Sequence, residues 1–286
     1  MAARFWVGGG SSANWAATSN TNWAATSGGT GNQTVPGSGD DVTFDGAGAT
    51  GNSASTVGAT ITVLSLTFTT GYTQTVTLSA NLTVAGNFTD RTQHSWAGAS
   101  TLIISAASTI TSNGKIFPNG VQLSGAVTYT MADAWTISGS VTPSAACTIN
   151  LSGLMTVGTW NFSTTCTFGG TFGWTCTTCN ISNTTATNIT LANTITYTIT
   201  GSLVARSGSF ATKPTVTSDH ATNKAILTLN NGATCNTNCN YTRIDASGGR
   251  SINTFNGTVT TCLNVNSFTD ALPPAIGVFV RAGGVN

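Results

Sequence analysis

The 286-residue sequence predicts an all-β protein whose strands stack into a β-solenoid, also called a β-helix. Threonine is far more frequent than in ordinary proteins, and its branched, hydroxylated side chain suits a pleated, water-facing strand better than a helix. Helix-forming residues are scarce, because the chain has no glutamate and only nine lysines and arginines together. A short strand phrase also recurs along the chain, as is typical of repeat architectures.

The recurring phrase has apolar, polar and apolar positions followed by small or hydroxyl residues. Its copies occupy 76–82, 82–88, 102–108, 121–127, 135–141, 149–155 and 197–203. Each copy predicts one strand with alternating faces that ends in a corner of small residues. The copies between Leu102 and Ile149 follow one another closely, with no helical spacer between them. These spacings favour a solenoid of stacked coils, and a β-sandwich of short strands is the alternative.

The first residues predict a cap on the solenoid. A stack of coils exposes strand edges at its ends, so terminal repeats are usually atypical and protective. Trp6, Trp15 and Trp23 lie among Gly, Ser, Asn and Ala, and we expect their side chains to cover the first coil. The Pro273-Pro274 pair predicts a final extended arm, because proline disfavours helix and central strand. The expected units are a cap and attachment segment over 1–47, a solenoid body over 48–230, and a C-terminal cap with an extended arm over 231–286.

Three aspartates stand where the cap leads into the first coil. Asp40 and Asp41 are adjacent in an extended segment and point to opposite faces, whereas Asp41 and Asp45 share a face. We interpret Asp40, Asp41 and Asp45 as residues that bond the neighbouring backbone in turns, which short acids commonly do. A pair of catalytic carboxylates or a Ca²⁺ site is the alternative interpretation.

Other acid and base groups are few. Asp219 and His220 are adjacent in a polar loop without a nucleophile in register, and His94 is interpreted as a lone loop histidine. Large aromatic residues within the strand phrases are predicted to lie in the core rather than along a groove; they are Trp135, Trp160, Trp174 and Phe172. We therefore expect a protein that is not an enzyme and that uses no cofactor.

Seven cysteines allow three interpretations. Cys176 and Cys179, together with Cys235 and Cys239, have a spacing that could form a four-thiolate zinc site if the two pairs met in space. One or more disulfides are the second possibility. The third, which we favour, is a set of free thiols that pack inward as small apolar residues. The odd number of cysteines, with no recognisable secretory signal at the start, favours reduced thiols made in a cytoplasm.

The charge distribution argues against two classes of partner. The net charge is +1, and the basic residues are scattered from Arg4 to Arg281 rather than clustered. No basic patch with interleaved aromatic residues is available for nucleic acid. The sequence also contains neither a polybasic run nor an apolar stretch of transmembrane length, which are the features that would indicate membrane binding. We expect neither nucleic acid nor membrane as a partner.

The two ends of the chain carry several distinctive phrases: RFWVGGG (4–10), the Asn-Trp pairs at 14–15 and 22–23, ATSGG (25–29), VPGSGDDVTFD (35–45) and NYTRIDASGGRSINTFNGT (240–258). These phrases resemble a group of proteins from tailed bacteriophages in which phrases of this kind at the N-terminus are followed by β-helical repeats. The resemblance covers the two ends of the chain, over 1–47 and from about position 232 onward, and it transfers no catalytic residue. It implies a structural or surface-binding role on a virion.

From this resemblance we expect a virion exterior protein that is synthesised in the host cytoplasm. The main hypothesis is a capsid decoration (cement) protein or a short fibre, as a homotrimer that binds the major capsid protein or a tail protein. A tail fibre or tailspike that binds host surface glycan is the alternative. A bacterial surface adhesin is a second alternative, which the missing export signal weakens.

Overall fold

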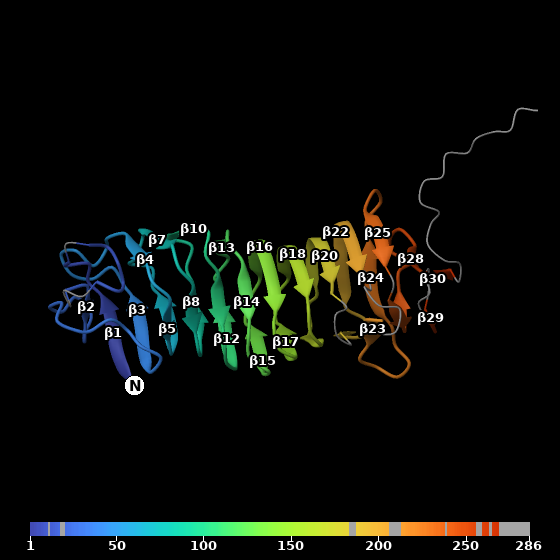
Figure 1. The fold of residues 1–286 in the computed structure, drawn as a ribbon, viewed down its shortest axis with the longest axis horizontal. Coiled ribbons are helices and arrows are strands. Elements are labelled where there is room, and N and C mark those ends of the chain that lie inside the picture. The colour runs from blue at the N-terminus through green and yellow to red at the C-terminus, as the bar shows by residue number, and fades with distance from the viewer. Residues whose placement is uncertain are drawn as a thin grey trace, which may run out of the picture.

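The protein is a stack of β-coils in a computed structural model that describes residues 1–10, 12–17, 21–182, 187–205, 213–237, 239–255, 259–262 and 265–268. The coils form an elongated rod, with the N-terminal strands at one end and β28 to β30 at the other (Figure 1). Every named element is a strand, and the pairings between named strands are parallel apart from β1 with β2. The predicted all-β solenoid is therefore confirmed.

Three sheets run along the rod. The first contains β1 (Ala2–Trp6), β2 (Trp23–Ala24), β3 (Asp40–Phe44), β6 (Ser65–Phe68), β9 (Phe88–Thr89), β12 (Ser108–Thr111), β15 (Thr128–Met131), β17 (Cys147–Leu151), β19 (Cys166–Gly170), β21 (Asn188–Leu191), β23 (Thr215–Ser218), β26 (Asn240–Thr242) and β29 (Val259–Thr260). The second is short and contains β4 (Ser55–Val57), β7 (Thr75–Leu78) and β10 (Ser95–Gly98).

The third sheet is the longest. It contains β5 (Ile61–Val63), β8 (Leu82–Val84), β11 (Leu102–Ile104), β13 (Ile116–Phe117), β14 (Val121–Leu123), β16 (Trp135–Pro143), β18 (Met155–Phe162), β20 (Trp174–Ile181), β22 (Thr196–Ala205), β24 (Ala225–Leu229), β25 (Thr234–Thr237), β27 (Ile244–Asp245), β28 (Ile252–Phe255) and β30 (Val265–Phe268). From β16 to β22 one long strand with a local irregularity replaces the two shorter strands of other coils.

The register gives the length of each coil. Ile149 lies opposite Phe168 on the next coil, whereas Ile189 lies opposite Val216, so the coils differ in length along the rod. The closest spacing of the strand phrases, from Val121 to Trp135 to Ile149, is shorter than any of these coils. The spacing of the phrases is therefore not the length of a coil, because the phrases at 121–127 and 149–155 begin in different sheets.

Apolar side chains form columns inside the rod. One column runs through six coils in the register of neighbouring strands, and each of its side chains is at most 1% exposed: Val42, Leu66, Phe88, Ile110, Met131 and Leu151. Trp135, Trp160 and Trp174 are also buried, so their predicted place in the core is confirmed. The same prediction was wrong for Phe172, which is 46% exposed because it lies in the corner between β19 and β20 rather than within a strand. Parallel stacking thus joins every coil to the next through a shared core.

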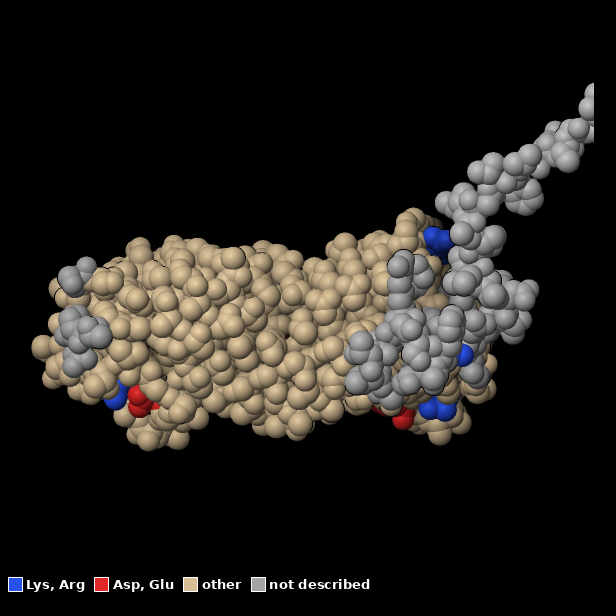
Figure 2. Space-filling model, in the orientation of Figure 1, with Lys and Arg blue, Asp and Glu red and all other residues tan. Residues whose placement is uncertain are grey.

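Threonine lines the outside of the same sheet. Seven threonines lie opposite one another on successive coils: Thr128, Thr148, Thr167, Thr190, Thr217, Thr242 and Thr260. The segment 134–205 carries no charged side chain, and the charged residues visible on the face in Figure 2 lie near the two ends of the rod. Hydroxyl groups therefore provide the polar surface of the middle coils.

The coil stack runs through all three predicted segments. It begins at β3, within 1–47, because β3 pairs with β6. It continues past position 230, where β25 pairs with β28 and β28 with β30. The expected extended arm lies outside the described residues.

Coil spacing leaves little room at the corners. Gly170 has a φ of +93°, and a Cβ on it would collide with the backbone of Leu151 on the preceding coil. Gly114 has a similar φ of +75°, but a Cβ there would meet nothing within 4 Å. We expect Gly170→Ala to reduce the free energy of unfolding by about 3 kcal/mol or more. Gly114→Ala should cost about 1 kcal/mol, from backbone strain alone. Chemical denaturation of both variants measures the difference, and equal losses would show that the close approach of the coils is unimportant.

Candidate functional site: the N-terminal cap and the polar corners

Four aromatic rings form the centre of the cap. Trp6 and Trp15 stack on Phe44, with ring centroids 5.6 and 5.1 Å away, and Trp23 meets Phe44 edge-on at 5.8 Å. All four side chains are at most 1% exposed. Phe44 also stacks on Phe68 of the next coil at 5.0 Å. The three tryptophans therefore cover the first coil as expected, and their rings are not available as a contact surface for a partner.

Backbone pairing fixes the tryptophans in place. Trp6 lies opposite Trp23 in the antiparallel pair β1–β2, while β1 pairs in parallel with β3. The Trp15 amide donates to the carbonyl of Thr56 at 2.8 Å. The indole of Trp23 in turn donates to the Trp15 carbonyl at 3.0 Å. A short antiparallel strand thus covers the edge of the first sheet, which is a common way to blunt an edge strand.

The asparagine before each of two tryptophans organises the cap loops. Asn22 is 1% exposed; its amide nitrogen donates to the carbonyls of Ser12 at 2.7 Å and Asn14 at 2.9 Å. Its side-chain oxygen accepts from the Gly10 amide at 2.8 Å. The Asn14 side-chain oxygen accepts from the Ala16 amide at 3.0 Å. The repeated Asn-Trp dipeptide was the signal in the sequence, but the bonds of Asn22 to Ser12 and Asn14, in another part of the cap, were not predicted.

The three cap aspartates make separate structural contacts. Asp40 faces Arg4 with 3.6 Å between Oδ2 and Nε, and it accepts from the Gly37 amide at 3.0 Å. Asp41 accepts from the Ser65 hydroxyl on the next coil at 2.5 Å. Asp45 accepts from the Ala47 amide at 3.0 Å, as in an Asx turn. Asp40 and Asp45 therefore bond the backbone of their own turns as expected, whereas Asp41 instead bonds a side chain on the next coil. The three carboxylates make these contacts in different places.

A buried polar corner joins the coil of β9 and β10 to the next one. Asp90 is fully buried; its carboxylate contacts His94 Nε2 at 2.5 Å and accepts from the Trp96 indole at 2.8 Å. The Lys115 ammonium donates to the carbonyl of His94. Burial lowers the pKa of Lys115, and the charge of Asp90 opposes this shift. His94 thus lies in a loop between β9 and β10 as expected, but the interpretation that it is a lone residue was wrong.

The corner resembles an acid–base pair but lacks access to a substrate. Asp90 and His94 are 0% and 2% exposed, and the imidazole stacks on Phe68 at 4.0 Å. Asn113 of the next coil donates to the Asp90 carbonyl at 2.7 Å. A catalytic acid or base must reach the atom that it protonates or deprotonates. We interpret the corner as a structural connection between coils.

Asp219 and His220 face different neighbours. Asp219 accepts from the Asn193 amide at 2.7 Å. His220 Nδ1 accepts from the amides of Thr222 at 3.2 Å and Asn223 at 3.1 Å. Asp219 thus bonds a residue of the preceding coil, whereas His220 fixes its own turn, and these contacts do not bring the two into an acid–base pair.

The structure places Cys176 and Cys179 inside the core. An irregularity in β20 turns both side chains inward although they are three positions apart. They are 1% and 2% exposed, and their mutual hydrogen bond, together with burial, raises the pKa of the Cys179 thiol. Burial likewise raises the pKa of the Cys239 thiol to about 12. Among the described residues no three His, Cys, Asp or Glu side chains are placed to hold a metal ion. The zinc hypothesis for Cys176, Cys179, Cys235 and Cys239 therefore gains no support.

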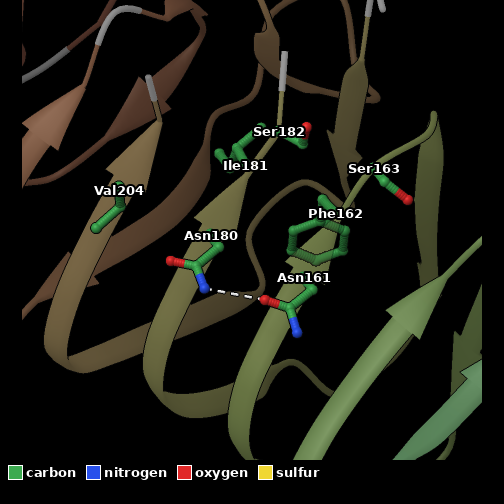
Figure 3. Close-up of a pocket in the computed structure, with 7 residues that line it drawn as sticks. All are labelled: Asn161, Phe162, Ser163, Asn180, Ile181, Ser182 and Val204. Carbon is green, nitrogen blue, oxygen red and sulfur yellow. Dashed lines mark hydrogen bonds between the residues drawn. The ribbon is translucent and has the colours of Figure 1, made fainter. Parts of the chain in front are cut away.

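A surface hollow lies where β18, β20 and β22 end. Asn180 donates to Asn161 across neighbouring coils at 2.9 Å (Figure 3). The other residues that line the hollow are Phe162, Ser163, Ile181, Ser182 and Val204. None of the described residues that line it is ionisable. The hollow therefore offers amide and hydroxyl groups for weak polar contacts, and it provides no group for acid–base chemistry.

Comparisons with known proteins do not identify the chain: no family, no curated protein and no solved structure matches it. Within the described part of the chain, no helix is long and apolar enough to cross a membrane. The function must therefore be argued from the residues themselves.

Proposed function

We propose that the chain is a non-enzymatic structural protein on the exterior of a bacteriophage particle. In this proposal it is a capsid decoration protein or a short fibre that assembles as a homotrimer. The observation that carries the proposal is the overlap between the phage-like phrases and the cap. The cap is built from residues of these phrases: Trp6, Asn14-Trp15, Asn22-Trp23 and the segment that ends in Phe44 and Asp45.

The polar chemistry of the rod supports a passive role. Asp90 and His94 lie in a buried corner. Asp219 and His220 bond different loops. Glycosidases need two carboxylates that flank an accessible bond. Of the large aromatic residues that could stack on sugar rings, Trp135, Trp160 and Trp174 are buried, whereas Phe172 is 46% exposed. These features favour a decoration protein or short fibre over a glycan-binding tailspike.

The shape also fits this role. Parallel coils separated by about 4.8 Å, about ten in number, give a rod roughly 50 Å long. Figure 1 shows the elongated arrangement of these coils. Each coil is joined to its neighbours by backbone hydrogen bonds and shared core columns. Such a body suits a knob on a shell or a fibre segment better than a long host-reaching fibre.

Cryo-electron microscopy of particles from a phage that encodes this chain tests the proposal. We expect rod-shaped density at symmetric capsid positions or along a short fibre, absent from particles made without the gene. Purified protein should have a mass in solution near three times the chain mass of 28.9 kDa. Density confined to the tail tip would favour the tailspike alternative. Purified particles that lack the chain would contradict the proposal.

A further inference from the structure

Two cysteines lie side by side on neighbouring coils. Cys147 begins β17 and Cys166 begins β19, and the two residues are paired in the parallel register of the first sheet. Their sulfur atoms are 3.8 Å apart. Their separation along the sequence is the length of this coil, because paired positions on β17 and β19 are one coil apart. The juxtaposition therefore results directly from the register.

The backbone separation matches that of a disulfide. Neighbouring strands lie about 4.8 Å apart, and the Cα atoms of disulfide-bonded cysteines are usually about 4.4–6.8 Å apart. The two sulfurs need to approach by rotation of their side chains, without a change of register. We propose that Cys147 and Cys166 form a reversible disulfide that links two successive coils when the protein meets an oxidising environment.

The two thiols differ in access. Cys147 is 7% exposed and lines a surface hollow with Thr128, Thr148 and Thr165, whereas Cys166 is fully buried. The hydrogen bond from the Cys166 thiol lowers the pKa of Cys147. The same hydrogen bond, together with burial, raises the pKa of Cys166 well above its usual range. Cys147 is therefore the attacking thiol, because the thiolate is the nucleophile in disulfide exchange.

The oxidant in this proposal is a small-molecule disulfide, such as glutathione disulfide. The Cys147 thiolate attacks one sulfur of the oxidant, whose S–S bond breaks and releases one thiolate. Cys166 then gives up its proton and attacks the Cys147 sulfur of the mixed disulfide, and the second small thiolate leaves. The two protons lost by the cysteines end on the two small thiols. The protein is oxidised by two electrons and the oxidant is reduced by two.

Other cysteines are placed differently. Cys176, Cys179 and Cys239 are at most 2% exposed, and the hollow that Cys147 lines does not include them. Cys262 is half-buried, and its sulfur accepts from the Ile244 amide at 3.4 Å. We therefore expect Cys262 to be accessible to reagents and use it as the control position. The proposed disulfide is independent of the virion role, because its formation depends only on the redox environment of the protein.

Peptide mapping of the full chain tests the proposal. Reduced protein is incubated with mixtures of oxidised and reduced glutathione, alkylated with iodoacetamide and digested without reduction. Trypsin does not separate the cysteines, since no lysine or arginine lies between them, but chymotrypsin can cleave after Leu151, Trp160 and Phe162. We expect a Cys147–Cys166 linked peptide that disappears on reduction. Recovery of both residues as alkylated thiols at every ratio would overturn the proposal.

Three variants separate the roles of the two sulfurs. In Cys166→Ser, Cys147 should accumulate the mixed disulfide with glutathione, because the resolving thiol is absent. In Cys147→Ser, Cys166 should stay unmodified, while Cys262→Ser should form the linked peptide as the wild type does. Circular dichroism verifies that each variant is folded. If a variant is not folded, the peptide mapping of the wild-type protein alone tests whether the disulfide forms. A mixed disulfide on Cys166 in Cys147→Ser would contradict the assigned order of attack.

Discussion

Replacing Phe44 with alanine is expected to lower the free energy of unfolding by about 3–5 kcal/mol. Phe44 is fully buried and contacts all three cap tryptophans as well as Phe68 and Tyr72. Its removal leaves a cavity between large, rigid rings that are held by backbone pairing and cannot collapse easily. Urea denaturation followed by tryptophan fluorescence and circular dichroism measures the loss.

The matched control is Phe172→Ala. Phe172 is 46% exposed, so its replacement should change the free energy of unfolding by only about 0.5 kcal/mol. Because the end of a repeat protein can unfold separately, hydrogen exchange should also show faster exchange in β1 and β3 of Phe44→Ala than in the middle coils. Similar losses for both variants, or unchanged exchange in β1 and β3, would contradict the central role of Phe44 in the cap.

The cap illustrates what the sequence can and cannot predict. Trp6, Trp15 and Trp23 were recognisable because large apolar residues in a polar, glycine-rich segment need a common burial site. Phe44 was not singled out, although its ring touches all three. The identity of a central contact depends on how β1 and β3 pair, and local alternation does not contain that information.

The same limit applies between coils. The side chains around Asp90 include Lys115 and Asn113, which lie one coil further along the chain. Cys147 and Cys166 are likewise neighbours only because the length of their coil brings them into register. Alternation of apolar and polar residues predicted the strands, since it reports burial of one face. Coil length varies with the corners, so the sequence alone did not predict which side chains face each other.

The buried corner around Asp90 should be the second most sensitive place to substitution, as measured by the free energy of unfolding. Asp90→Ala is expected to lower the free energy of unfolding by about 3–5 kcal/mol, as removal of one partner from a buried charged network commonly does. The variant leaves His94 and the Trp96 indole without their carboxylate partner in a site that is closed to water. Asp90→Asn keeps the shape but places an amide NH₂ group against one of these two side chains, so it should lose at least half as much stability.

Asp219→Ala is the control for these variants. Asp219 is exposed and accepts from the Asn193 amide at 2.7 Å, so its removal should cost about 1 kcal/mol or less. Urea denaturation of the three variants at one pH gives the comparison directly. If Asp90→Asn is as stable as the wild type, the carboxylate charge is not needed and the corner is held by packing of His94 on Phe68. If all three variants lose equally little, the corner does not connect the coils, and the stability of this region comes from the apolar columns and the parallel ladders instead.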